Sequence, residues 1–333
     1  MLQPLIFLLA LIAGFALMIK SADVVTDHAS LISKKRGISE MTIGMILVAL
    51  ATSLPELAVS TTSAFFGETG IALGNILGSN ITNIAFVLGI CALIRPIVID
   101  KRAVKFDGIW MLLSTAIVVI LMGYGAIGIT TYYSPHLDEN STALSIGYGN
   151  FGRIDGSISL LFFIIFLYFL KKNENDNLGV EKSGEPILID IVMSLSAGAI
   201  VWVGSWLVMW AVEGFAEYFG INPIYLALTV VALGTSLPEL FVSISALRKG
   251  LRSISVGNLI GSNMFNLLIV LGISSIIRPI LITDVALTSY IPMMVFTSVL
   301  GIIFMRTRWR LDRWEGFILV ALYVLFVLFV FGV

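Results

Sequence analysis

The feature that most constrains this chain is a series of apolar stretches, each about long enough to cross a lipid bilayer as a helix. A bilayer core about 30 Å thick needs roughly 20 apolar residues per helix. The ten stretches cover residues 3–28, 40–66, 71–94, 108–130, 155–171, 187–213, 224–247, 254–277, 285–305 and 313–332. With 58% hydrophobic and 12% charged residues, the chain has about half the charge of a soluble domain. The sequence therefore predicts an all-α membrane protein with ten transmembrane helices.

A second feature is an internal duplication at a constant offset of 183 residues. The segment Ala49-Leu-Ala-Thr-Ser-Leu-Pro-Glu-Leu57 returns as Ala232-Leu-Gly-Thr-Ser-Leu-Pro-Glu-Leu240, and each copy is followed by Gly-Asn-x-x-Gly-Ser-Asn-x-x-Asn. Without a gap, 25 of the 48 positions in 49–96 are identical to their partners in 232–279. The duplicated unit is about half the chain, which is too long for a solenoid repeat.

The basic residues indicate the orientation of the chain in the membrane. Seventeen of the 20 lie in alternate connections: Lys34, Lys35, Arg36, Arg95, Lys101, Arg102, Lys105, Lys171, Lys172, Lys182, Arg248, Lys249, Arg252, Arg306, Arg308, Arg310 and Arg313. The other connections hold only Arg153 and Arg278. Because Lys and Arg accumulate on the cytoplasmic side of short loops, we expect both termini outside, in a multi-pass protein of the cell membrane.

An odd number of spans in each half makes the two halves inverted relative to each other. We expect a first five-helix repeat in 1–172 with its duplicated segment at about 40–96, a short cytoplasmic linker at 173–186, and a second repeat in 187–333 with its duplicated segment at about 223–279. Secondary transporters use inverted repeats with broken helices to build a site near the bilayer midplane. The long first and sixth spans are candidates for the mobile gate.

The repeated proline explains how such a site could arise. Pro55 and Pro238 lack an N–H, so the carbonyls of Ala51 and Gly234, four residues earlier, lose their helical partner. In a membrane such groups must be satisfied by protein, water or an ion. A carboxylate at this depth is costly and is by default a functional residue, so the sequence predicts that Glu56 and Glu239 bind cations.

The ligand types next to each break favour a hard cation. The hydroxyls of Thr52, Ser53, Thr235 and Ser236 join the two carboxylates, and Ca²⁺ takes about six to eight oxygen ligands. Downstream, Ser79 and Asn83 share one helix face, as do Ser262 and Asn266. We assign these faces to the cavity and the neighbouring glycines to helix packing. His28 and His136 lie outside the apolar motifs, so imidazole ligation is not expected.

These two motifs resemble the α-repeats of the sodium/calcium exchanger family within the calcium/cation antiporters. The resemblance implies ten helices, with four motif helices that cluster around adjacent calcium and sodium sites. It assigns calcium to Glu56, Glu239, Thr52 and Thr235 and a central polar pair to Asn83 and Asn266. It assigns sodium to Ser53, Ser236, Ser79, Ser262 and the backbone carbonyls of Ala49 and Ala232.

The residue at position 266 departs from the family pattern, because well-studied sodium-coupled members carry an aspartate there. Two glutamates give the site a charge of about −2, which one Ca²⁺, two Na⁺ or two protons would neutralise. Three Na⁺ would leave about +1 in a low-dielectric site, at an electrostatic cost. Sodium remains the first choice because paired serines and free carbonyls supply neutral oxygen ligands.

The predicted function is therefore alternating-access exchange of Ca²⁺ for Na⁺, with the bilayer as surroundings and these ions as substrates. A proton- or potassium-linked antiporter of the same superfamily is the alternative, and a cation channel a weaker one. An enzyme is not expected: the sequence has no His-Glu-x-x-His motif and no histidine near the Thr-Ser-Leu-Pro turn to activate a serine. We expect no cofactor, no nucleic-acid partner and no obligate protein partner, which fits a monomer.

Overall fold

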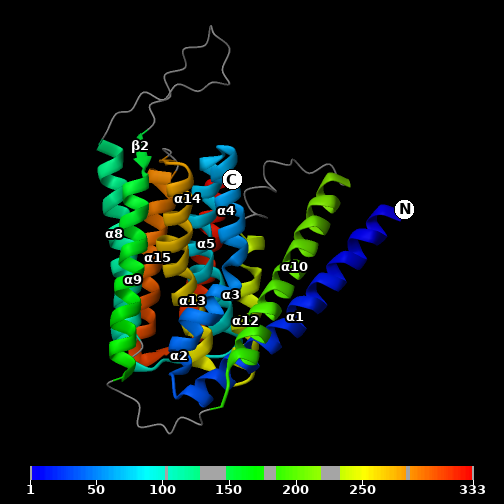
Figure 1. Ribbon diagram of the computed structural model, residues 1–333. Helices are drawn as coiled ribbons and strands as arrows, with labels where there is room; N and C mark the ends of the chain where they lie inside the picture. The colour runs from blue at the N-terminus through cyan, green and yellow to red at the C-terminus, as the bar shows by residue number, and fades with distance from the viewer. Residues whose placement is uncertain are drawn as a thin grey trace.

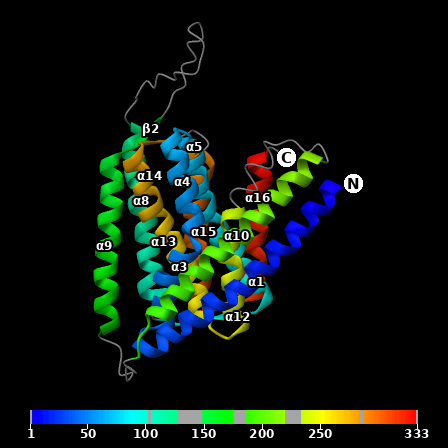
Figure 2. The same cartoon turned by 45° about the vertical axis from the view of Figure 1, so that its right-hand side comes forward.

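A computed structural model describes residues 2–101, 104–127, 148–175, 185–218, 233–282 and 286–331. The chain forms an upright bundle of helices with one inclined pair, α1 and α10, against its side (Figure 1). After a turn of 45° the pair still lies side by side, now in front of the bundle (Figure 2). The N- and C-termini lie toward the same end of the molecule.

The helices of the first half follow the predicted apolar stretches closely. They are α1 (Leu2–Arg36), α2 (Glu40–Ile43), η1 (Gly44–Val48), α3 (Ala49–Thr52), α4 (Leu54–Phe66), α5 (Thr69–Ile81), η2 (Thr82–Leu88), α6 (Gly89–Ile94), η3 (Val104–Gly108), α8 (Ile109–Ile127) and α9 (Arg153–Asn175). The labels η1, η2 and η3 mark π-helical turns within longer helices. Such turns often occur at functional sites.

The second half repeats this order. Its helices are α10 (Leu188–Tyr218), α12 (Leu237–Arg248), α13 (Arg252–Phe265), η4 (Asn266–Val270), α14 (Leu271–Ile277), η5 (Ala286–Tyr290), α15 (Ile291–Arg306), η6 (Thr307–Trp309) and α16 (Arg313–Phe331). The π-helical turns η2 and η4 begin at Thr82 and Asn266, so each contains one of the predicted polar pair, Asn83 and Asn266.

Eight described helices are long and apolar enough to cross a membrane, and the pair Glu40–Thr52 and Leu54–Phe66 would form a ninth, bent span. The predicted span at 224–247 begins among residues 219–232, which lie outside the described ranges. The segments 128–147 and 176–184 are also outside them, and the second includes most of the predicted linker. The chain is thus an all-helical membrane protein.

The predicted helix breaks are present at both prolines. At the first, the helix bends by 48° between Thr52 and Leu54. Ser53 has φ −90° and ψ 9°, and Ser236 has φ −89° and ψ 1°. These angles lie in the sparsely populated region between helix and strand. The two prolines sit in the first turn of the helices that follow, where a missing N–H costs nothing.

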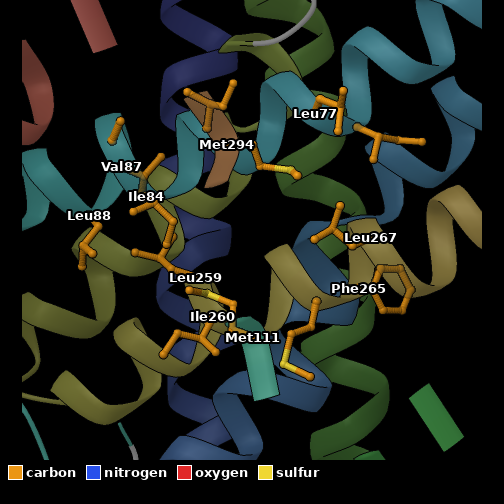
Figure 3. Close-up of a cluster of buried hydrophobic side chains, with 14 of the residues drawn as sticks. Leu77, Ile84, Val87, Leu88, Met111, Leu259, Ile260, Phe265, Leu267 and Met294 are labelled. Atoms are coloured by element: carbon orange, nitrogen blue, oxygen red, sulfur yellow. The ribbon is translucent and has the colours of Figure 1, made fainter. Parts of the chain in front are cut away.

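The motif helices form the centre of the bundle. Of an 18-residue apolar window in each span, 83% is buried in Thr69–Ile94 and 78% in Arg252–Ile277, but only 28% in Gln3–Arg36. Around them, side chains from α5, η2, α8, α13 and α15 form one apolar cluster, which includes Leu77, Ile84, Met111, Leu259 and Met294 (Figure 3). The polar motif residues are therefore held within a packed core.

Helices α1 and α10 are antiparallel and pack mainly on each other. Backbones approach closely at Gly14 and Gly204, where a Cβ on either glycine would lie within 2.8 Å of the other helix. At the far end of the pair, Asp190 accepts hydrogen bonds from Lys35 at 2.8 Å and pairs with the His28 ring at 2.8 Å. A separate apolar cluster, with Met18, Val25, Val201 and Val208 among its members, joins the pair to the core.

The described residues include four short strands that were not predicted. They are β1 (Ile97–Val98), β2 (Tyr148–Phe151), β3 (Ile280–Ile282) and β4 (Arg310–Leu311). β1 pairs with β4 and β2 pairs with β3, both antiparallel. β1 and the start of β3 are 183 residues apart, so the duplication extends to these strands. Each is too short to give a visible alternating pattern.

Candidate cation site

The two glutamates predicted to bind cations lie in the first turns of α4 and α12, directly after the breaks. Both side chains are 0% exposed, and the hydroxyl of Ser53, three residues before Glu56, donates to Glu239 Oε1 at 3.1 Å. The chain therefore brings two carboxylates from sequence positions 183 apart into one buried region. An unpaired buried carboxylate is unstable unless a cation or proton balances it.

The two carboxylates have different hydrogen-bond partners. Oε1 of Glu239 accepts hydrogen bonds from the hydroxyls of Ser53 at 3.1 Å and Ser262 at 3.2 Å. Neither Oε atom of Glu56 has a hydrogen-bond partner among the described residues. Oε2 of Glu239 likewise has none. Three carboxylate oxygens are thus available to a cation.

Two asparagines, Asn75 and Asn258, connect the two copies. Neither was predicted to belong to the site. Thr52 Oγ1 donates to Asn258 Oδ1 at 3.0 Å, while Asn258 Nδ2 donates to Ser243 Oγ at 3.1 Å and to the Glu239 carbonyl at 3.5 Å. The arrangement holds each threonine against the glutamate-bearing helix of the other copy.

The same bridge is repeated in the other direction. Thr235 Oγ1 donates to Asn75 Oδ1 at 3.1 Å, and Asn75 Nδ2 donates to Ser60 Oγ at 2.9 Å and to the Glu56 carbonyl at 3.4 Å. The signal was available, since Asn75, Asn258, Ser60 and Ser243 are all identical at the 183-residue offset. The role of these four residues became clear only from the contacts between the two copies.

The downstream serines lie in the same region as the glutamates, as predicted. Ser79 Oγ is 3.2 Å from Thr235 Oγ1, and Ser262 Oγ is 3.3 Å from Thr52 Oγ1. Glycines of the second copy pack closely, because a Cβ on Gly257 or Gly261 would lie 2.5 Å or 2.4 Å from a backbone oxygen of residues 41–45. The predicted packing role is confirmed for these two glycines.

The predicted polar pair of asparagines does not form a direct pair. Asn83 Nδ2 donates instead to Asn263 Oδ1 at 3.1 Å, and Asn263 Nδ2 donates to the Asn80 carbonyl at 3.3 Å. Both side-chain atoms of Asn266 are buried without a described hydrogen-bond partner, as is Oδ1 of Asn83. Both asparagines are 0% exposed, so their free amide oxygens face a closed interior.

The backbone carbonyls near the breaks are partly occupied. Ala49 O accepts from the Ser53 N–H at 2.9 Å and the Thr52 hydroxyl at 3.3 Å. Gly234 O, expected to be free, accepts a hydrogen bond from Ser205 of α10. Ala232 lies outside the described residues, so its carbonyl remains a prediction.

The donor set is that of a hard-cation site. It consists of carboxylate, hydroxyl and amide oxygens, several of them buried and unpaired, and oxygen ligands of this kind suit Ca²⁺ and similar ions. The described residues contain no group of three or more His, Cys, Asp or Glu that could hold a metal. Two carboxylates supplemented by neutral oxygens would bind an ion more loosely than a permanent metal centre does.

Fold and site together define a polytopic membrane protein with a buried cluster of oxygen-bearing side chains that comes from two copies of one motif. A sequence profile described as sodium/calcium exchanger protein matches residues 6–172 and 189–332. The chain belongs to the sodium/calcium exchanger family.

Individual relatives match along nearly the whole chain. The sodium/calcium exchanger MaX1 of Methanosarcina acetivorans is 33% identical, with 97% of this chain and 98% of the relative covered. The inner membrane protein YrbG of Escherichia coli is 32% identical over 92% of this chain and 90% of its own length. A structure of the sodium-calcium exchanger NCX_Mj soaked with Na⁺ and Sr²⁺ has a TM-score of 0.77 at 28% identity, covering 97% of each chain.

Proposed function

We propose that this protein exchanges Ca²⁺ for Na⁺ across a membrane by alternating access, through one composite site made by both copies of the motif. Family membership and the sodium-calcium exchangers among its relatives support this substrate pair. The observation that carries the proposal is that Glu56 and Glu239 are both buried and that Ser53, three residues before Glu56, donates to Glu239. The combined charge of the two glutamates matches one Ca²⁺ or two Na⁺.

We assign calcium to Glu56, Glu239 and the Thr52 and Thr235 positions. Sodium would use oxygens that flank this centre, from Ser53, Ser236, Ser79, Ser262 and the carbonyls of Ala49 and Ala232. The unpaired oxygens of both glutamates and the unpaired Ser236 hydroxyl support this division. Because the two ions share the carboxylates, they would compete rather than bind together.

The arrangement in the membrane is a second part of the proposal. We place ten spans in two inverted five-helix repeats, residues 1–172 and 187–333 joined by the linker 173–186, with both termini outside the cell membrane. The two matched segments of the family profile, the antiparallel course of α1 and α10, and the termini at one end of the bundle support it.

Calcium flux into proteoliposomes under imposed gradients tests the proposal. We expect an outward Na⁺ gradient to drive Ca²⁺ uptake, and K⁺ or proton gradients of equal size to have no such effect. Flux driven only by the proton gradient would mean that H⁺, and not Na⁺, is the counter-ion. Flux that needs no counter-ion would indicate a channel.

A further inference from the structure

The end of the molecule opposite the termini carries a group of exposed cations around β1 and β4, which we call the basic corner. Helix α16 ends near the C-terminus, so its first residue, Arg313, lies at the opposite end (Figure 2). The connection from α15 to α16 supplies four of the cations, and the segment after β1 supplies two. They are Arg306, Arg308, Arg310, Arg313, Lys101 and Lys105.

The backbone of the basic corner has a fixed conformation. Strand β1 pairs with β4, and the Ile99 N–H donates to the Trp309 carbonyl at 2.9 Å. Arg308 and Trp309 both have φ 56°, in the left-handed region that residues other than glycine seldom adopt. The Nζ atoms of Lys101 and Lys105 lie 5.8 Å and 5.9 Å from the centre of the Trp309 ring. Strained backbone of this kind is typical of functional sites.

Most cations of the basic corner have no acidic partner. Among the described residues only Arg310 forms an ion pair, with its Nε 2.7 Å from Asp312 Oδ1. Glu315, the next acid along the chain, is 1% exposed and accepts a hydrogen bond from the Asp312 N–H at 2.8 Å. The remaining five cations of the corner are therefore available to an anion from outside the chain.

Basic residues elsewhere at this end of the molecule are paired within the protein. Lys35 lies 2.8 Å from Asp190, and Lys249 lies 2.7 Å from Asp27. These pairs join helices to each other. The accumulation of Lys and Arg on the cytoplasmic side accounts for the number of cations in the basic corner, but it does not require that they be held in place without acidic partners.

An apolar surface adjoins the cations on α15 and α16. Ile303 is 52% exposed, Trp314 54% and Phe317 66%. Ile303 precedes Arg306 by about one helical turn, and Phe317 follows Arg313 by about one turn. Tryptophan is enriched where a membrane meets water. A ligand that fits both surfaces carries negative charge at one end and is apolar at the other.

We propose that the basic corner binds the headgroup of an anionic phospholipid, whose acyl chains lie against the apolar surface of α15 and α16. Clusters of four to eight Lys and Arg beside a membrane span attract such lipids electrostatically. Because β1 belongs to the first half of the chain and β4 to the second, the bound headgroup contacts both halves. The proposed orientation places this lipid in the cytoplasmic leaflet, but its binding does not depend on ion exchange.

Native mass spectrometry of the full chain in detergent tests the proposal, with phosphatidylglycerol and phosphatidylcholine of the same acyl chains added in equal amounts. We expect the wild type to retain mainly phosphatidylglycerol. Lys101→Gln with Lys105→Gln should weaken this binding, as should Arg306→Gln with Arg308→Asn, in which asparagine tolerates the left-handed backbone. The expected loss is about fivefold for each cation removed, the equivalent of about 1 kcal/mol per Lys or Arg.

The matched control is Lys171→Gln with Lys172→Gln, since these two lysines are exposed at the end of α9 and their loss removes the same charge. Equal weakening by the control, or no preference for phosphatidylglycerol in the wild type, overturns the proposal. Displacement of the lipid by soluble glycerol phosphate would indicate a site for a small phosphate and also overturns it. If the arginine variant does not fold, the lysine variant decides by the same criterion.

Discussion

The two half-sites have the same sequence and different surroundings. The Glu239 carboxylate accepts hydrogen bonds from Ser53 and Ser262, whereas the Glu56 carboxylate accepts none from the described residues. The Ser236 hydroxyl, which mirrors Ser53, is also without a described partner. An internal duplication therefore does not give two equal sites.

The difference follows from how the copies are placed rather than from which residues they contain. A carrier that is open to one side at a time cannot be symmetric about the membrane midplane in any single state. In the present arrangement protein hydroxyls donate to one oxygen of Glu239, whereas its other oxygen and both oxygens of Glu56 have no partner among the described residues. We expect the roles of the two half-sites to exchange in the opposite state, so that variants of mirrored residues test the comparison.

The largest expected effect comes from neutralising either glutamate. Both Glu56→Gln and Glu239→Gln should lower Ca²⁺ flux in proteoliposomes by roughly 100-fold or more, since ligand charge sets calcium affinity. Glu68→Gln is the control, because Glu68 is exposed at the start of α5. Robust Ca²⁺ flux in either of the two variants would show that a single half-site is sufficient for calcium transport and would contradict a composite site.

Aspartate substitutions of Asn83 and Asn266 should have effects of intermediate size that differ from each other. Asn83→Asp removes the donor to Asn263 Oδ1 and sets two acceptors against each other, at a cost of about 1–3 kcal/mol in unfolding free energy. Asn266→Asp breaks no described hydrogen bond and adds a third carboxylate, so we expect a smaller loss of stability and a steeper dependence of Ca²⁺ flux on Na⁺.

Thermal unfolding in detergent and Na⁺ titration of flux measure these two outcomes. Asn266→Leu, which has a similarly branched side chain without polar atoms, is the control for loss of the amide. Equal destabilisation by both aspartates would mean that Asn83 and Asn266 are equivalent, contrary to their different partners.

The smallest effect distinguishes the mirrored serines. Ser53→Ala removes a hydrogen bond to Glu239, while Ser236→Ala removes none that the described residues make. We expect the ion-free Ser53 variant to be less stable by about 1 kcal/mol, as measured by thermal unfolding in Na⁺-free and Ca²⁺-free buffer. A larger loss for Ser236→Ala would reverse the assignment of the engaged and available half-sites.

Much of the fold could be predicted from the sequence because the bilayer imposes strong local rules. Helix length and apolar composition located the spans, and proline located both breaks within one residue. The bridges from Thr52 to Asn258 and from Thr235 to Asn75 could not be predicted. Their identical positions indicated importance, but which atoms meet depends on how the inverted copies cross.

Helix α10 contacts both breaks, with Gly198 against Ala51 and Ser205 against Gly234, and this is a second case. Neither Ser205 nor Gly198 belongs to a repeated motif, and nothing near them in the sequence marks them as partners of Gly234 and Ala51. A helix outside the motif approaches the site only after the central bundle has formed. The short strands were missed for a similar reason, since two or three residues carry too little pattern.

The sequence by itself determined that this is a membrane protein, where the two helix breaks lie and which oxygen-bearing side chains stand next to them. These features follow from local causes, namely the missing N–H of proline and the cost of burying a charge. Tertiary structure alone decided which carboxylate accepts hydrogen bonds from protein hydroxyls and which freed carbonyl is taken by α10. Those outcomes depend on distances between residues far apart in the chain, which the pattern of the duplicated motif does not show.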